Sequence, residues 1–170
     1  MDYVKEAKAL GFTQAALMPV SELVIVPEYR MFCEENLCGN YNVLPACPPA
    51  SGTVEEMTAK IYAGKTALVL KTEWPIEGYE DVGAIKDAKL SHNRAMLRMN
   101  ETLRGLCVGG SCCCLCSPCR MKAGEDCLYP DLRFSCMSAY CVDVAELAKR
   151  CGMDFRWDTR LLSVYSMIVL

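Results

Sequence analysis

Apolar and polar residues alternate along the chain with periods that predict helices and strands in turn. Residues 2–10 carry apolar side chains at helical spacing and stop at Gly11, which predicts a short helix ended by glycine. Residues 12–18 then read as extended. A capping box, Thr53-Val-Glu-Glu56, predicts a second helix from residue 53 to about 63.

The middle of the chain contains the clearest strand and the longest helix. Residues 66–72 form a short apolar run between Gly64 and Pro75, which is typical of a buried strand. Residues 79–104 predict a long amphipathic helix that ends at Gly105. Its apolar stripe consists of Val82, Ile85, Met96, Met99 and Leu103.

The last third continues the alternation. Residues 106–108 read as a short strand before the turn at Gly109-Gly110, and a second capping box, Asp143-Val-Ala-Glu146, predicts a helix to about Gly152. Residues 161–170 read as a buried strand. We expect an α/β (α+β) fold with a mixed β-sheet and packed helices, forming a single domain over residues 1–170. The strand order does not follow from these patterns.

Composition adds an unusual abundance of thiols. The 170 residues include 13 cysteines and one histidine, which is typical of either a secreted disulfide scaffold or an intracellular thiolate site. The N-terminus is charged from Asp2 onward and shows no secretory signal, and an odd number of cysteines cannot pair completely. These features favour a reducing, cytoplasmic location.

Charge and length exclude two classes of partner. The formal net charge is -3 with no basic stripe, so we expect no nucleic acid partner. The longest apolar run, residues 161–170, is much shorter than the ~20 residues of a membrane-spanning helix, so we expect no membrane partner.

One cysteine run has metal-ligand spacing. Cys113, Cys116, Cys119 and Cys127 follow the pattern C-x2-C-x2-C-x7-C-x2-P, with Pro130 as the final residue. Three cysteines at this spacing wrap a tight loop around a cubane iron–sulfur cluster. Structural zinc sites more often pair two C-x2-C units across a long spacer. The run favours [4Fe–4S] chemistry, with zinc or free thiols as alternatives.

A second cysteine group precedes the first. Cys33, Cys38 and Cys47 lie in a stretch rich in glycine, asparagine and proline, which predicts a loop. Their spacing matches no common zinc or ferredoxin pattern and is a weak signal alone. Pro48 follows Cys47 directly, however, and proline beside a cysteine is a feature of cluster loops. We therefore expect cysteine-rich, irregular metal-binding loops at about 31–50 and 107–141.

Taken together, these motifs resemble a known family. Cys33-Glu-Glu-Asn-Leu-Cys-Gly-Asn-Tyr41, Cys47-Pro-Pro49, the tight cysteine loop and Met137-Ser-Ala-Tyr-Cys-Val-Asp-Val144 look like the predicted metal-binding proteins of the domain-of-unknown-function 2284 family. The resemblance spans about Ala15 to Leu170 and implies metal binding without an assigned reaction. The family's seven recurrent cysteines fall on Cys33, Cys38, Cys47, Cys113, Cys116, Cys119 and Cys127.

The remaining cysteines depart from that pattern. Cys136 and Cys141 stand where the family has a serine-like residue and a glycine, and Cys107, Cys112, Cys114 and Cys151 are extra. Seven thiolates are one short of two fully ligated cubanes. Either Cys136 completes the site of Cys33, Cys38 and Cys47, or one iron is left open. Cys127 could also belong to either cluster.

Other residues carry weaker signals. His92 lies on the apolar stripe of the long helix and is expected to be a hydrogen-bonded structural histidine, and Met96 and Met99 are expected to fill the core. Glu34 and Glu35 are expected to face solvent. Gly64-Lys65-Thr66 lacks the first glycine of a phosphate loop and precedes a strand.

The sequence thus predicts an iron–sulfur protein with one or two [4Fe–4S] clusters. Electron transfer is the first hypothesis, because thiolate-ligated clusters exchange single electrons and no nucleotide, flavin or nucleophile motif is present. A redox protein is then the expected partner. Two alternatives stay open: an enzyme with an open iron acting on a small substrate, and a structural zinc or metal-binding module. Catalytic residues and oligomeric state do not follow from the sequence.

Overall fold

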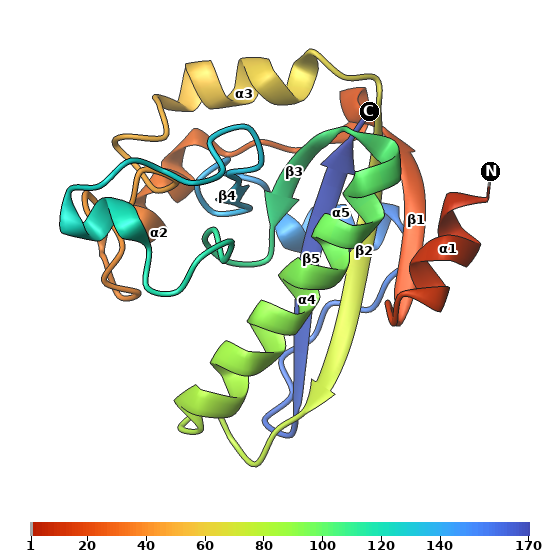
Figure 1. Cartoon of the computed structure of the whole chain (residues 1–170). Helices are drawn as coiled ribbons and strands as arrows, with labels where there is room; N and C mark the ends of the chain where they lie inside the picture. The colour runs from red at the N-terminus through yellow and green to blue at the C-terminus, as the bar shows by residue number, and fades with distance from the viewer. Residues whose placement is uncertain (1) are drawn as a thin grey trace.

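Five strands form one mixed sheet in the computed structural model, which describes residues 2–170 (Figure 1). The strand order is β1-β2-β5-β3-β4, with β3 and β4 parallel and the other neighbours antiparallel. The strands are β1 Gln14–Pro19, β2 Thr66–Pro75, β3 Leu106–Gly109, β4 Ser135–Cys136 and β5 Leu161–Val169. The predicted mixed sheet is confirmed, and the C-terminal strand lies in its centre.

The helices begin where side chains cap them. Asp2, Thr53, Asp81 and Asp143 each accept a backbone N–H of the first turn that follows. The α-helices are α1 Tyr3–Ala9, α2 Met31–Glu34, α3 Val54–Tyr62, α4 Val82–Leu103 and α5 Val144–Arg150, and the 3-10 helices are η1 Val20–Glu22, η2 Pro27–Arg30 and η3 Arg120–Ala123. The α+β class is confirmed. Within residues 2–170, no helix has the length and apolar character needed to cross a membrane.

Some boundaries differ from those predicted. β2 continues three residues beyond residue 72, because it pairs with β5 over its whole length to Pro75. α4 begins at Val82 instead of residue 79, because Asp81 caps it through the N–H of Ala84 at 3.0 Å. Val82 is 71% exposed and does not belong to the apolar stripe. The short elements α2, β4 and the 3-10 helices were not predicted.

The second capping box forms only in part. The Asp143 carboxylate accepts the N–H of Glu146 at 2.9 Å, as predicted. The N–H of Asp143, however, donates to the carbonyl oxygen of Val24 at 2.9 Å. The Glu146 side chain instead accepts from Arg150 at 3.1 Å. A tertiary contact thus replaces half of a local motif.

Alternate residues of β2 pack against helices on opposite faces of the sheet (Figure 1). Leu68 and Leu70 contact the layer of α1 and α4, which contributes Met96 and Met99. Val69 belongs to the other layer, which is formed by α3 and α5. The sheet is therefore covered on both faces, and the predicted core positions of Met96 and Met99 are confirmed.

A buried histidine joins α4 to the sheet. The Nδ1 of His92 lies 2.7 Å from the Thr72 hydroxyl, and its Nε2 lies 2.7 Å from the Ser166 hydroxyl. Burial lowers the pKa of His92 to about 3, so the ring is neutral near pH 7. The prediction of a hydrogen-bonded structural histidine is confirmed.

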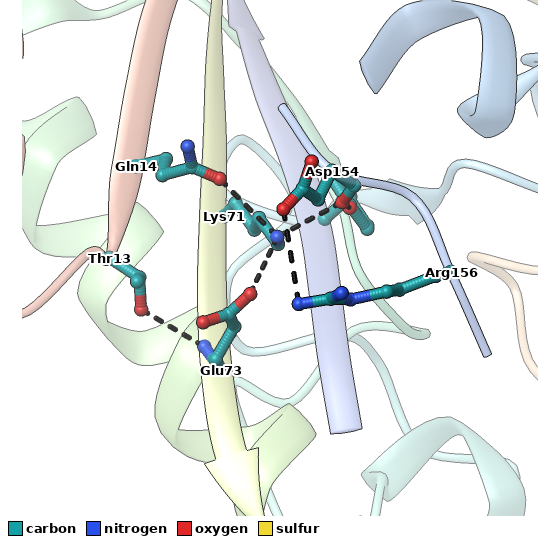
Figure 2. A network of polar contacts seen from close by, with 7 residues as sticks. Thr13, Gln14, Lys71, Glu73, Asp154 and Arg156 are labelled. Carbon is teal, nitrogen blue, oxygen red and sulfur yellow. Dashed lines mark hydrogen bonds and ion pairs between the residues drawn. The ribbon is translucent and has the colours of Figure 1, made fainter. Parts of the chain in front are cut away.

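A buried lysine lies on the opposite face of β2 (Figure 2). The Lys71 ammonium is 2.6 Å from the Glu73 carboxylate, 3.3 Å from Gln14 Oε1 and 3.0 Å from the Asp154 carbonyl oxygen. It also lies 5.7 Å from the ring centroid of Tyr165. These contacts satisfy the charge and connect β1, β2, β5 and the segment after α5.

Two irregular segments lie beside β3 and β4 (Figure 1). They comprise residues 31–50 and 110–136, and we call them the cysteine-rich edge. Short elements, α2, η3 and β4, interrupt turns and bends in this region. Ten of the thirteen cysteines lie in these two segments. The edge therefore contains every cysteine that the sequence predicted as a ligand.

Candidate metal centre

All thirteen cysteines have free thiols, and three of them lie outside the cysteine-rich edge. Cys107 is buried in β3, under α4. Cys141 is buried, and its thiol donates to the carbonyl oxygen of Pro27 at 3.7 Å. Cys151 ends α5, and its thiol lies 3.6 Å from the Met18 sulfur. These three thiols serve the packing of the body.

Cys33 and Cys136 come together from distant parts of the sequence. Cys33 lies in α2 and Cys136 in β4, the outermost strand of the sheet. The interaction between their thiols raises the pKa of Cys33 and lowers the pKa of Cys136. Backbone N–H groups of Ala139 and Ser138 also lower the pKa of Cys136. Within this pair, the environment of Cys136 favours the thiolate form.

Cys47 and Cys112 lie next to this pair. Burial raises the pKa of Cys47 to about 12, and the neighbouring thiols of Cys112, Cys136 and Cys38 add to this rise. Burial likewise raises the pKa of Cys112, with Cys136 and Cys38 contributing. We call this set the first thiol group: Cys33, Cys38, Cys47, Cys112 and Cys136.

Asparagine side chains shape the loop that carries Cys38. Asn36 has a left-handed backbone, with φ of 54°, and its side-chain oxygen accepts the N–H of Tyr41 at 3.0 Å. Asn40 directs its side-chain N–H to the sulfur of Cys112 at 3.5 Å. The exposed Cys38 is therefore held in a turn that is connected to the other segment of the edge.

The tight loop forms the second thiol group, which we define as Cys113, Cys116, Cys119 and Cys127. Burial raises the pKa of Cys113, the backbone N–H groups of Leu115 and Phe134 oppose that rise, and the nearby thiols of Cys116 and Cys127 add to it. The loop turns through η3 and through Gly124, whose φ is 77°. An ion pair between Arg120 and Glu125 closes the turn. All four thiols are half-buried.

The two thiol groups are neighbours in space. Cys113 of the second group is among the charges that raise the pKa of Cys47 and of Cys112 in the first group. Cys112 and Cys113 are consecutive in the chain and lie in the segment that follows β3. This segment therefore contributes one thiol to each group.

The donor set suits a thiolate-ligated metal or cluster. A metal-bound cysteine is a thiolate, and N–H donors next to its sulfur stabilise that charge. Such donors lie beside Cys136 and Cys113, one in each group. Across residues 2–170, no three Cys, His, Asp or Glu side chains are arranged closely enough to form a single-ion site as they stand.

The structure brings the predicted ligands together unevenly. Cys33, Cys47 and Cys136 are neighbours, with Cys38 at the outer side, and Cys113 lies near Cys116 and Cys127. Cys112 was not a predicted ligand, although it joins the first group. Cys112 lies in a run of three consecutive cysteines, and the sequence does not indicate which of the three belongs to which thiol group. Glu34 and Glu35 are exposed, as expected.

Fold and thiols together define an α+β protein with a cysteine-rich site at one edge of its sheet. The family model described as "Predicted metal-binding protein (DUF2284)" matches residues 16–170, and the chain belongs to this family. The resemblance inferred from the cysteine motifs is therefore confirmed. Searches of the curated proteins and of the solved structures found no significant match.

Proposed function

We propose that this protein holds two [4Fe–4S] clusters at the cysteine-rich edge and transfers electrons. The first thiol group would ligate one cluster and the second thiol group the other. The observation that carries this proposal is the proximity of Cys33 and Cys47, from the segment 31–50, to Cys136, from the distant segment 110–136. Cys47 is buried, Cys33 and Cys136 are half-buried, and each of the three thiols is near enough to influence the pKa of another. A shared inorganic core explains this arrangement better than packing does.

Cys136 is our choice for the fourth ligand beside Cys33, Cys38 and Cys47. Its proximity to Cys33 and its N–H donors support this choice. Cys112 is the rival, because it also neighbours Cys38 and Cys136. With either residue, four thiolates would ligate the cluster and no iron would remain open for a substrate.

The position of the two groups supports electron transfer. When bound, the clusters would supply one-electron exchange with little reorganisation. The chain contributes the short separation of the groups, through Cys112 and Cys113, and a surface beside them. Leu37 is 89% exposed, and Leu128 and Leu132 are also exposed on the same edge. These apolar side chains would contact a redox protein partner. The free thiols favour a reducing compartment, the cytoplasm.

The test is the metal content of protein purified without oxygen. We expect brown protein with about eight iron atoms and about eight labile sulfides per chain, which is the content of two cubanes. Colourless protein with stoichiometric zinc would contradict the proposal and favour a structural metal-binding module. Electron paramagnetic resonance of the reduced protein should show two interacting clusters.

A pair of serine variants distinguishes the fourth ligand. Cys136→Ser should change the spectrum and lower the iron content of the cluster at the first thiol group, whereas Cys112→Ser should leave both unchanged. The reverse result would assign Cys112 as the ligand. Unchanged signals in both variants would indicate an open iron or a ligand other than cysteine.

A further inference from the structure

A cavity of about 570 Å³ opens where the edge of β5 is left uncovered by β3. β3 pairs with β5 only between Leu106 and Val108, and the chain then turns away at Gly109-Gly110. The segment 163–165 of β5 therefore lines the cavity directly. The volume is within the range of ~300–1,000 Å³ that is usual for small-molecule sites.

Aromatic rings dominate the lining. Five of the chain's fourteen aromatic residues (two Trp, eight Tyr and four Phe) line this cavity: Tyr29, Phe32, Phe155, Trp157 and Tyr165. Trp157 is 83% exposed, and Phe32 and Phe155 are also exposed. Large exposed rings around a concave site offer faces on which another flat ring can stack.

The charged groups at the cavity favour an anion. Asp143 is already engaged, because its carboxylate caps α5 through the N–H of Glu146 and accepts the Tyr29 hydroxyl at 3.4 Å. Lys89, from α4, is half-buried, and no ion pair or hydrogen bond of its ammonium is found within residues 2–170. The cavity therefore presents one available cation.

We propose that this cavity binds a planar aromatic anion, with its ring stacked on Trp157 and Phe155 and its acidic group on Lys89. The site goes beyond the proposed clusters, because no thiol is required for it. Two of the lining residues, Phe32 and Met137, are direct chain neighbours of Cys33 and Cys136. Redox-active members of the class are for that reason the first compounds to test.

The experiment is calorimetric titration of the folded full chain, under anaerobic conditions, with three probes. These are flavin mononucleotide, 1,4-naphthoquinone-2-sulfonate and 2-naphthoate, and riboflavin serves as the uncharged counterpart of the first. We expect at least one anion to bind 1:1 with a Kd below about 100 µM, which exceeds the affinity of non-specific contacts. Iron and sulfide are measured on the same sample, so absence of clusters and absence of binding are separate results.

Two variants assign the binding to this cavity. Trp157→Ala should weaken binding of every probe about tenfold through lost stacking. Lys89→Met should weaken the anions about fivefold and leave riboflavin unchanged. The matched controls are Tyr62→Ala, an exposed ring on α3, and Lys86→Met, one turn earlier on α4; both should bind like the unchanged protein.

Two results would overturn the inference. The first is that none of the anions binds with a Kd below about 100 µM to protein whose circular dichroism shows a folded chain. The second is that the Trp157 and Lys89 variants bind as tightly as their controls, which would place the ligand elsewhere.

Discussion

The body of the molecule and its cysteine-rich edge differ in the origin of their contacts. In the body, β2 and β5 pair over nine positions, from Ala67↔Val169 to Pro75↔Leu161, and helices cover both faces. Buried polar side chains such as His92 and Lys71 have partners in the fold. At the edge, residues 31–50 and 110–136 form mostly turns, and their many thiols lie close together. Packing thus stabilises the body, whereas the edge carries thiols that a bound metal would hold together.

The two thiol groups show a second difference. The second group comes from one short loop, whereas the first collects thiols from α2, β4 and the loops between. Ligands from a single loop need little of the fold, whereas ligands from two distant segments fix those segments relative to one another. Metal in the first group should therefore contribute more to the order of the edge.

The largest effect should follow from removing the metal. We expect an iron chelator, under anaerobic conditions, to raise amide hydrogen exchange about a hundredfold in residues 31–50 and 110–136, because binding and local folding are coupled. Exchange in β2 and β5 should change less than about twofold. Hydrogen-exchange mass spectrometry measures both regions at once. If β2 and β5 lost as much protection as the edge, the proposed difference between the body and the edge would be wrong.

Removing one ligand should cost about half of the iron. Cys116→Ser should lose the cluster of the second thiol group, because three thiolates at that site leave one iron without its cysteine. Cys151→Ser is the matched control, since Cys151 ends α5 in the body. Iron analysis of both proteins gives the answer. An unchanged iron content in the Cys116 variant would show that this loop does not ligate a cluster.

Lys71→Met should destabilise the body by about 2 kcal/mol and leave the iron unchanged. The substitution leaves Glu73, Gln14 and the Asp154 carbonyl without their shared donor. The value is moderate because Glu73 is partly exposed to solvent. Urea unfolding should show this loss, and Lys149→Met, on the exposed face of α5, should show none. A loss of iron in the Lys71 variant would show that metal binding at the edge depends on the stability of the body.

The smallest effect concerns pH. The pKa of His92 is about 3 when folded and 6.5 in its ordinary state, so its neutral burial stabilises the fold above pH 6.5 and this stability is lost as the pH falls. Between about pH 7.5 and 5.5 the loss should be about 1.4 kcal/mol. His92→Gln should abolish this slope in urea unfolding of metal-free protein. A slope that persists in that variant would assign it to other groups.

The features that the sequence predicts best are those that depend on residues close together in the chain. The Thr53 capping box, the β2 core run and the spacing from Cys113 to Cys127 are local, and the sequence is enough to identify each of them. The first thiol group depends on contacts between α2 and β4, which lie far apart in the chain. Its pairing of Cys33 with Cys136 requires the strand order, which periodicity alone does not contain. For the same reason, the contribution of Cys112 could not be predicted.

The exposed aromatic cavity could not be predicted from the sequence either. Its lining comes from η2, α2, α4, residues 137–145, the segment around Phe155 and β5, and it exists because β3 is too short to cover β5. Hydrophobic periodicity identifies strands, but the length over which two strands pair is set by where one of them turns away. Gly109-Gly110 indicated a tight turn, without indicating which strand edge it would leave open.

The central place of β5 has a consequence for the order of events during protein synthesis. β3 and β4 are connected to β1 and β2 only through β5, which is translated after all of them. Until residues 161–169 have left the ribosome, β3 and β4, which carries Cys136, have no link through the sheet to β1 and β2. On the proposed function, metal would therefore be inserted at the first thiol group only after translation of β5, whereas the tight loop of the second group would be available earlier.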